Sequence, residues 1–280
     1  MADAGEFEPH HALVTAPDAS PDRWLLVLHG VFGSGDNFRL FARKLCEARP
    51  RWGVCLVDLR GHGRSQGAPP PHTLAAAADD VLRLEARLGL RVAAVAGHSF
   101  GGKVALSLLS RRTTRLEHAF LLDSPPGARA AGNGAREVLA LLRGIPEPLS
   151  SREQFLTLVE AAGHSRPIAE WLAMNVRRSD DGFRLRLELD TIQALLDDYF
   201  ARDLWRVVEG PVGTDQLEVI VGGRSDVIGA AERERFAEVA ERTPSVRLHV
   251  LERAGHWVHV DDPQGVLSVL TRALGEQSGV

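Results

Sequence analysis

The chain has few of the residues that build disulfide frameworks or bind metal ions. Its 280 residues include only two cysteines, Cys46 and Cys55. Two cysteines are too few for a disulfide scaffold and lack the paired spacing of a metal site. We expect both thiols to be small buried apolar groups. The pattern predicts a protein with no bound metal in a reducing compartment, and hence a cytoplasmic location.

The sequence also lacks a basic run and a long apolar run. Its 33 basic and 37 acidic residues give a net charge of −4, which argues against a nucleic-acid partner. No apolar stretch approaches the roughly 20 residues that a membrane-spanning helix requires. The N-terminal segment MADAGEFEPHH is acidic and has no apolar centre, so we do not expect it to be a signal peptide.

What the sequence does contain is an alternation of apolar runs and helical patterns. Short apolar runs that are not interrupted by charge predict strands buried on both faces, and the helices between them predict a mostly parallel sheet. The expected strands in the first half are 24–30, 53–61, 91–99 and 116–126, and the expected helices are 36–50, 72–89 and 101–112.

The alternation stops after the fourth of these strands and returns near residue 217. Between the fourth strand and residue 217, successive helical patterns predict a helical cap inserted into an α/β core. "RLRLELD" (184–190) alternates by twos, which fits a short half-exposed strand or a linker. We therefore expect a core domain made of residues 1–123 and 210–280 and a cap made of residues 124–209.

The stretch Gly97-His98-Ser99-Phe100-Gly101 places a serine where a predicted strand meets a predicted helix. A sharp strand-to-helix turn of this kind needs glycines on both sides, because side chains there would clash. It lifts the serine hydroxyl to the N-terminus of a helix, where developing negative charge is stabilised. A dinucleotide-binding loop would need a different glycine spacing. We interpret Ser99 as a nucleophile.

A serine hydroxyl needs a base, and the base needs an orienting acid. His256 lies in a glycine-flanked loop after the last predicted strand, the expected place for that base. Two aspartates follow strands at the same sheet edge: Asp226 in "VGGRSDVIG" and Asp123 in "LLDSPP". We favour Asp226 as the acid and keep Asp123 as the alternative. Ser225 is a candidate further hydrogen-bonding partner.

The loop "LHGVFGSGDN" (28–37) follows the first strong strand and carries three glycines. Such a loop can turn back over the serine and direct the Val31 N–H at a reacting carbonyl oxygen. The Phe100 N–H, directly after the nucleophile, is the second expected donor of this oxyanion hole. The side chain of Phe32 is then free to line an apolar acyl pocket.

Five ordered motifs together resemble the α/β-hydrolase superfamily, and most of all the small YbfF-type esterases. They are "HGVFGS", "VDLRGHGRS" (57–65), "GHSFGGK" (97–103), "LLDSPP" and "AGHWVH" (254–259). The resemblance implies the α/β-hydrolase fold and a carboxylester or acyl thioester hydrolase without a cofactor. Members of this group can use the aspartate of the "D-x-x-P" segment as the acid. Here "GGRSD" also supplies Asp226, so the resemblance does not choose between the two.

We therefore expect a serine hydrolase that acts on a small-molecule ester or thioester with an apolar acyl group. The same triad also serves C–C bond hydrolases, lactonases, perhydrolases and peptidases. A hydrolase fold retained as a ligand receptor is disfavoured by the intact serine, histidine and acid. The sequence does not indicate whether the protein is a monomer or an oligomer, because a buried cap face and a subunit interface have the same composition.

Overall fold

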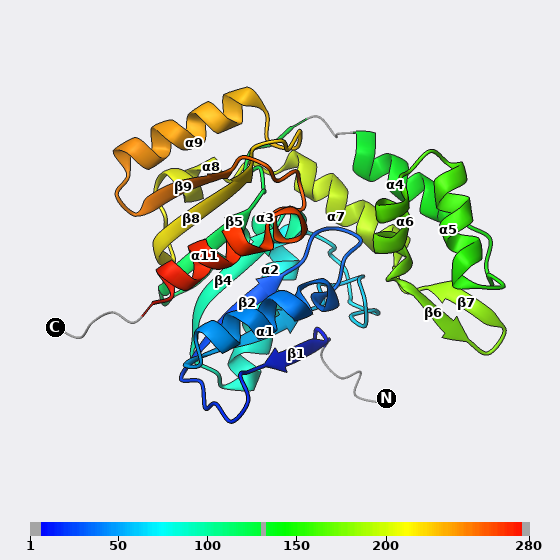
Figure 1. Ribbon diagram of the computed structural model, residues 1–280, viewed down its shortest axis with the longest axis horizontal. Helices are drawn as coiled ribbons and strands as arrows, with labels where there is room; N and C mark the ends of the chain where they lie inside the picture. The colour runs from blue at the N-terminus through cyan, green and yellow to red at the C-terminus, as the bar shows by residue number, and fades with distance from the viewer. Residues whose placement is uncertain (1–6, 130–132, 276–280) are drawn as a thin grey trace.

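A single large sheet forms the centre of the fold and takes its strands from both halves of the sequence. The computed structural model describes residues 7–129 and 133–275. Seven strands pair in the order β1-β3-β2-β4-β5-β8-β9 (Figure 1). They are β1 (His11–Val14), β2 (Arg23–Leu28), β3 (Trp52–Val57), β4 (Val92–His98), β5 (Leu116–Leu122), β8 (Thr214–Gly222) and β9 (Val246–Leu251). Only the pairing of β1 with β3 is antiparallel. The predicted α/β class with a mostly parallel sheet is confirmed.

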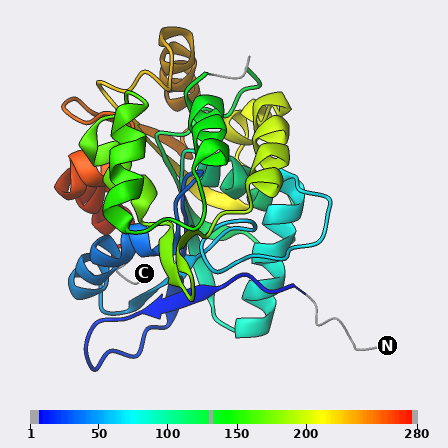
Figure 2. The same ribbon diagram turned by 90° about the vertical axis from the view of Figure 1, so that its right-hand side faces the viewer.

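Helices cover both faces of this sheet, which explains why its central strands are apolar along their whole length. Figure 2 shows the two helical layers on either side of the sheet. One layer contains η1 (Gly35–Phe38), α1 (Arg39–Ala48), α10 (Val258–Asp261) and α11 (Pro263–Ala273). The other contains α2 (Leu74–Leu88), α3 (Phe100–Leu109), α8 (Trp205–Glu209) and α9 (Ala230–Arg242). Cys46 and Cys55 are buried free thiols, as expected.

Between β5 and β8 the chain leaves the sheet and forms a group of helices beside it (Figure 1). We call residues 124–209 the cap segment; its status as a separate domain stays a prediction, and residues 130–132 lie outside the described ranges. The segment contains α4 (Asn133–Gly144), α5 (Arg152–Ala161), α6 (Arg166–Ala173) and α7 (Leu189–Ala201). It also contains a hairpin of β6 (Val176–Ser179) and β7 (Gly182–Leu185).

Two elements differ from expectation. The edge strand β1 is not predicted by the sequence, because its four residues are too few to show an alternation. The alternating stretch 184–190 is divided between two elements: β7 ends at Leu185 and α7 begins at Leu189. Strand β7 of the hairpin begins at Gly182, two residues before this stretch. Gly182 adopts a φ of +146°, which favours glycine.

Within the described ranges, no helix combines the length and the apolar character needed to cross a membrane. The acidic N-terminal segment, on which we base the expectation of no signal peptide, is described only from residue 7 onward.

Candidate active site

Ser99 lies at the turn between β4 and α3, in a backbone conformation that ordinary residues avoid. Its φ and ψ angles are +51° and −113°, a strained combination for a residue with a side chain. The Ser99 N–H donates to the Leu122 carbonyl at 3.0 Å, and the Ser124 hydroxyl donates to the Ser99 carbonyl at 2.7 Å. Neighbouring strand β5 and the residues after it therefore hold the strained turn in place.

The glycines that flank Ser99 are required by close backbone contacts. A Cβ atom on Gly97 would overlap the Gly101 carbonyl, and one on Gly101 would overlap the Leu28 carbonyl. The first contact lets the chain reverse from strand to helix, and the second lets α3 begin directly against β2. The geometric reason for the G-x-S-x-G spacing is thus present in the structure.

His256 is paired with a buried carboxylate at the end of β5. Its Nδ1 lies 2.7 Å from Oδ2 of Asp123. A carboxylate only accepts, so Nδ1 donates and the neutral ring keeps Nε2 as an acceptor. Asp123 is 0% exposed. Its oxygens also accept from the Ser225 hydroxyl at 2.5 Å and from the Gly222 N–H at 2.9 Å, so each oxygen of this buried carboxyl group has a hydrogen-bond partner.

Asp226, the acid that we favour from the sequence, lies elsewhere. It is exposed at the rim of the cavity described below, and its carboxylate makes no hydrogen bond to His256 in the described ranges. After β8 the chain turns so that Ser225 points inward to Asp123 while Asp226 points to solvent. The structure therefore brings Asp123, not Asp226, to the imidazole, and Ser225 joins that network as expected.

Two residues that line the cavity together with Ser99, Val31 and Phe100, have backbone N–H groups without an internal partner among the described residues. In the described part of the chain, the N–H groups of Val31 and Phe100 donate to no protein acceptor. Phe100 is the first residue of α3, where helical N–H groups are always unpaired. Phe32 is buried with a φ of +60°, and its carbonyl accepts from the Asn175 side chain of the cap segment at 2.7 Å.

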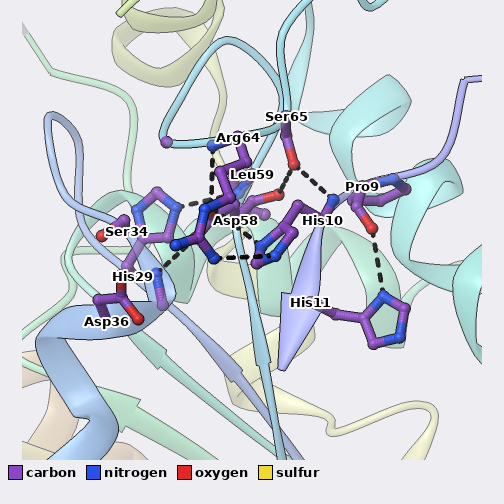
Figure 3. A network of polar contacts seen from close by, with 12 residues as sticks. Pro9, His10, His11, His29, Ser34, Asp36, Asp58, Leu59, Arg64 and Ser65 are labelled. Carbon is purple, nitrogen blue, oxygen red and sulfur yellow. Dashed lines mark hydrogen bonds and ion pairs between the residues drawn. The ribbon is translucent and has the colours of Figure 1, made fainter. Parts of the chain in front are cut away.

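The loop that carries Val31 is anchored on the loop that follows β3. His29 donates through Nδ1 to the Gly30 carbonyl at 2.8 Å, and its Nε2 accepts from the Leu59 N–H at 2.9 Å. The Asp58 carboxylate accepts from the N–H groups of Gly35 and Arg64 (Figure 3). The "DLRGHGRS" motif thus supports the candidate oxyanion loop through the Leu59 N–H and the Asp58 carboxylate.

A cavity of about 810 Å³ opens above Ser99 and His256. Its walls include the apolar side chains of Val31, Phe32, Phe38, Val138, Ile168, Trp171, Leu196, Phe200 and Trp257. Most of the cavity wall that comes from the cap segment is apolar. The cavity therefore fits a substrate whose larger part is apolar.

Two further histidines pack beside His256 without carrying charge. His98 donates from Nε2 to the His256 carbonyl at 2.9 Å, and burial lowers its pKa well below the ordinary value. Burial likewise lowers the pKa of His259 to about 3, and its ring stacks on Phe38 at 4.2 Å. Both rings are neutral near pH 7, so they add no like charge beside His256. His98 also holds the His256 carbonyl through its hydrogen bond.

Some residues at the site carry no signal in the sequence that we could use. Asn175 reaches Phe32 from 143 positions away, and an asparagine after a helix usually indicates a turn. Ser124 is preceded by the recognisable Asp123, but nothing in "LLDSPP" indicates its contact with Ser99. Positive φ angles are a signal visible only in the structure: Phe32, Ser99 and Asp123 all have them, and such strain gathers at functional sites.

Comparison with known proteins finds matches both in sequence and in fold. A sequence model of the alpha/beta hydrolase family matches residues 25–269. The sn-1-specific diacylglycerol lipase ABHD11 of Mus musculus is 29% identical over 259 residues, which cover 89% of this chain and 80% of that protein. Esterase YbfF of Escherichia coli (strain K12) is 26% identical over 263 residues, which cover 94% and 97%. A solved structure described as a marine microorganism esterase has a TM-score of 0.81 at 23% identity and covers 95% of this chain and 99% of its own.

Proposed function

Because this chain belongs to the alpha/beta hydrolase family, we propose that it is a serine carboxylesterase acting through Ser99, His256 and Asp123. The predicted resemblance to YbfF-type esterases is confirmed by the comparisons, and the protein is a hydrolase. The observation that carries the proposal is the pairing of His256 with the buried Asp123 in the cavity where Ser99 stands on its strained turn.

The proposed reaction begins when Oγ of Ser99 attacks the carbonyl carbon of the ester and loses its proton to Nε2 of His256. Asp123 orients the ring and stabilises the imidazolium. The N–H groups of Val31 and Phe100 bind the oxyanion, each contributing about 3 kcal/mol in the transition state. His256 then protonates the leaving alcohol or thiol. Water attacks the acyl-enzyme by the same proton route and regenerates Ser99.

The proposed substrate is a small ester or thioester with an apolar acyl group. The apolar walls of the cavity support this class, and so do the names of two relatives, a diacylglycerol lipase and an esterase. We place the reaction in the cytoplasm, in keeping with the two free buried thiols.

A fluorophosphonate probe tests the proposal directly, because it reacts with activated serines. We expect wild-type protein to be labelled and Ser99→Ala to remain unlabelled. The wild type should also hydrolyse p-nitrophenyl esters, and a series of acyl lengths would map the cavity. Equal labelling of the two proteins would refute the role of Ser99. Turnover of a dienol-type diketone in place of esters would instead indicate a C–C bond hydrolase.

A further inference from the structure

A lysine on the helix that follows the nucleophile is buried where the cap segment joins the core. Lys103 is 0% exposed, and its ammonium donates to the carbonyls of Gly127, Tyr199 and Arg202 at 2.7, 2.7 and 2.8 Å. Gly127 lies where the chain leaves the sheet for the cap segment, and Arg202 lies at the end of α7, where the chain returns. One side chain therefore ties both connections of the cap segment to α3.

The two connections also hold each other at this point. The Leu204 N–H donates to the Pro126 carbonyl at 2.9 Å, and the Arg129 N–H donates to the Phe200 carbonyl at 3.0 Å. These bonds join the outgoing chain to the returning chain. The Lys103 ammonium then fixes the joined pair to the helix that begins beside Ser99.

The use of lysine at this position has a physical reason. The chain uses arginine for nearly all of its 33 basic residues and has lysine only at positions 44 and 103. An ammonium carries three donors on one atom and can serve three converging carbonyls, whereas a guanidinium spreads its donors over a plane. Two of the carbonyls lie at the C-terminal end of α7, where the helix dipole favours a cation. Burial lowers the pKa of Lys103 to about 8, so the amine is still protonated at neutral pH.

The helix end that Lys103 holds forms part of the cavity wall. Leu196 and Phe200 of α7 line the cavity together with Ser99. Phe200 directly follows Tyr199, whose carbonyl Lys103 binds. A shift of this last turn of α7 would move both apolar side chains relative to the nucleophile. The position of the wall therefore depends on the contacts of Lys103.

We propose that Lys103 is a positioning residue for substrate selection: it fixes the last turn of α7 to α3 and so holds Leu196 and Phe200 against the acyl chain of the substrate. This inference rests on the esterase function proposed above. The wall favours only substrates with an apolar chain, because each methylene group that it covers contributes about fourfold to binding. Loss of the lysine contacts should reduce the preference for longer acyl chains and leave the chemistry at Ser99 unchanged.

The test compares two esters that differ only in acyl length, p-nitrophenyl octanoate and p-nitrophenyl acetate. The quantity measured is the ratio of their kcat/KM values, octanoate over acetate, in which any loss of active protein cancels. We expect Lys103→Met to lower this ratio about tenfold, as when about two methylene groups lose contact. An unchanged or raised ratio would overturn the proposal. The matched control is Lys44→Met on α1, a change at the only other lysine, which should keep the wild-type ratio.

A double-mutant comparison tests whether Lys103 acts through the wall. Phe200→Ala removes part of the wall and should lower the ratio by itself. Adding Lys103→Met to Phe200→Ala should then lower the ratio little further. Independent, multiplying losses would show that Lys103 does not act through Phe200. An unchanged ratio in Phe200→Ala would place the acyl chain elsewhere and would likewise refute the proposal.

Hydrogen exchange tests the tether without any enzymatic assay. The Arg202 N–H donates to the Asp198 carbonyl within the last turn of α7. We expect backbone amides of residues 198–204 to exchange faster in Lys103→Met than in the wild type, and those of α1 to exchange at the same rate in both. Equal exchange at residues 198–204 would show that Lys103 does not fix this turn.

Lys103→Gln covers the case in which Lys103→Met does not fold, because its amide still donates two hydrogen bonds. We expect it to lower the ratio and to speed exchange at the end of α7, both by less than methionine does. A glutamine variant with the wild-type ratio would refute substrate selection through Lys103. If the wild type hydrolyses no ester, the proposed function fails, whereas hydrogen exchange still decides whether Lys103 fixes α7.

Discussion

Nδ1 of His256 lies 2.7 Å from Oδ2 of Asp123, a carboxylate that is fully buried at the end of β5. This pairing joins the last loop of the chain to its middle, 133 positions away. The carboxylate also holds the Gly222 N–H and the Ser225 hydroxyl. The loop after β8 therefore hydrogen-bonds the carboxylate that pairs with His256 and does not supply that carboxylate.

Exchanging each aspartate for asparagine distinguishes the two acids. Asp123→Asn should lower kcat on the order of 10⁴-fold, because an amide at this position no longer fixes the productive histidine tautomer or stabilises the imidazolium. Asp226→Asn is the matched control: its carboxylate is exposed and solvent-screened, so kcat should change by no more than about threefold. Steady-state hydrolysis of a p-nitrophenyl ester measures both. The reverse order of effects would restore Asp226 as the acid.

The sequence indicates the sharp turn at Ser99 more directly than it indicates which carboxylate pairs with His256, for a physical reason. The turn at Ser99 works only with glycine at positions 97 and 101, so its geometry is written into five consecutive residues. The acid depends on the direction of the loop after β8. A difference of one residue decides whether Ser225 or Asp226 faces inward, and no local pattern encodes that direction.

The contacts of the cap segment are harder still to predict. Asn175 binds the Phe32 carbonyl, and Lys103 binds carbonyls on both connections of the segment. In each case a side chain meets a backbone group far away in sequence, and a backbone carbonyl leaves no trace in residue type. The alternating strands and helices of the core, by contrast, follow from burial on both faces of the sheet and are predicted correctly.

The contact between Asn175 and Phe32 leads to a prediction about the oxyanion loop. Asn175→Ala removes the hydrogen bond that holds the loop at a residue with positive φ. The Val31 N–H should then be misplaced, and kcat should fall about tenfold or more with KM little changed, because small displacements of a donor are costly in the transition state. The measurement is steady-state hydrolysis beside a thermal unfolding curve.

The control for this variant is Ser179→Ala, which removes a surface contact with Asp181 on the adjacent hairpin. It should leave kcat and the unfolding curve as in the wild type. If Asn175→Ala lowers the unfolding temperature but leaves kcat intact, the side chain stabilises the cap segment and has no part in aligning the oxyanion loop.

The buried ring of His259 predicts how the stability of the protein depends on pH. Burial holds the pKa of His259 at about 3 in the fold, against an ordinary value of 6.5. Between these two values the unfolded chain binds a proton that the folded chain does not, so the free energy of unfolding falls as pH falls. At pH 5 this one ring lowers the free energy of unfolding by about 2 kcal/mol relative to pH 7.5.

His259→Phe removes the titrating group and keeps an aromatic ring against Phe38. Its free energy of unfolding, measured with urea, should lose about 2 kcal/mol less than the wild type between pH 7.5 and pH 5. Phe38→Leu alters the same stack without removing a proton site, so it should keep the wild-type pH dependence even where it lowers stability at every pH. Parallel pH curves for His259→Phe and the wild type would mean that the ring takes up its proton in the fold, and that a charged histidine can stand beside His256 after all.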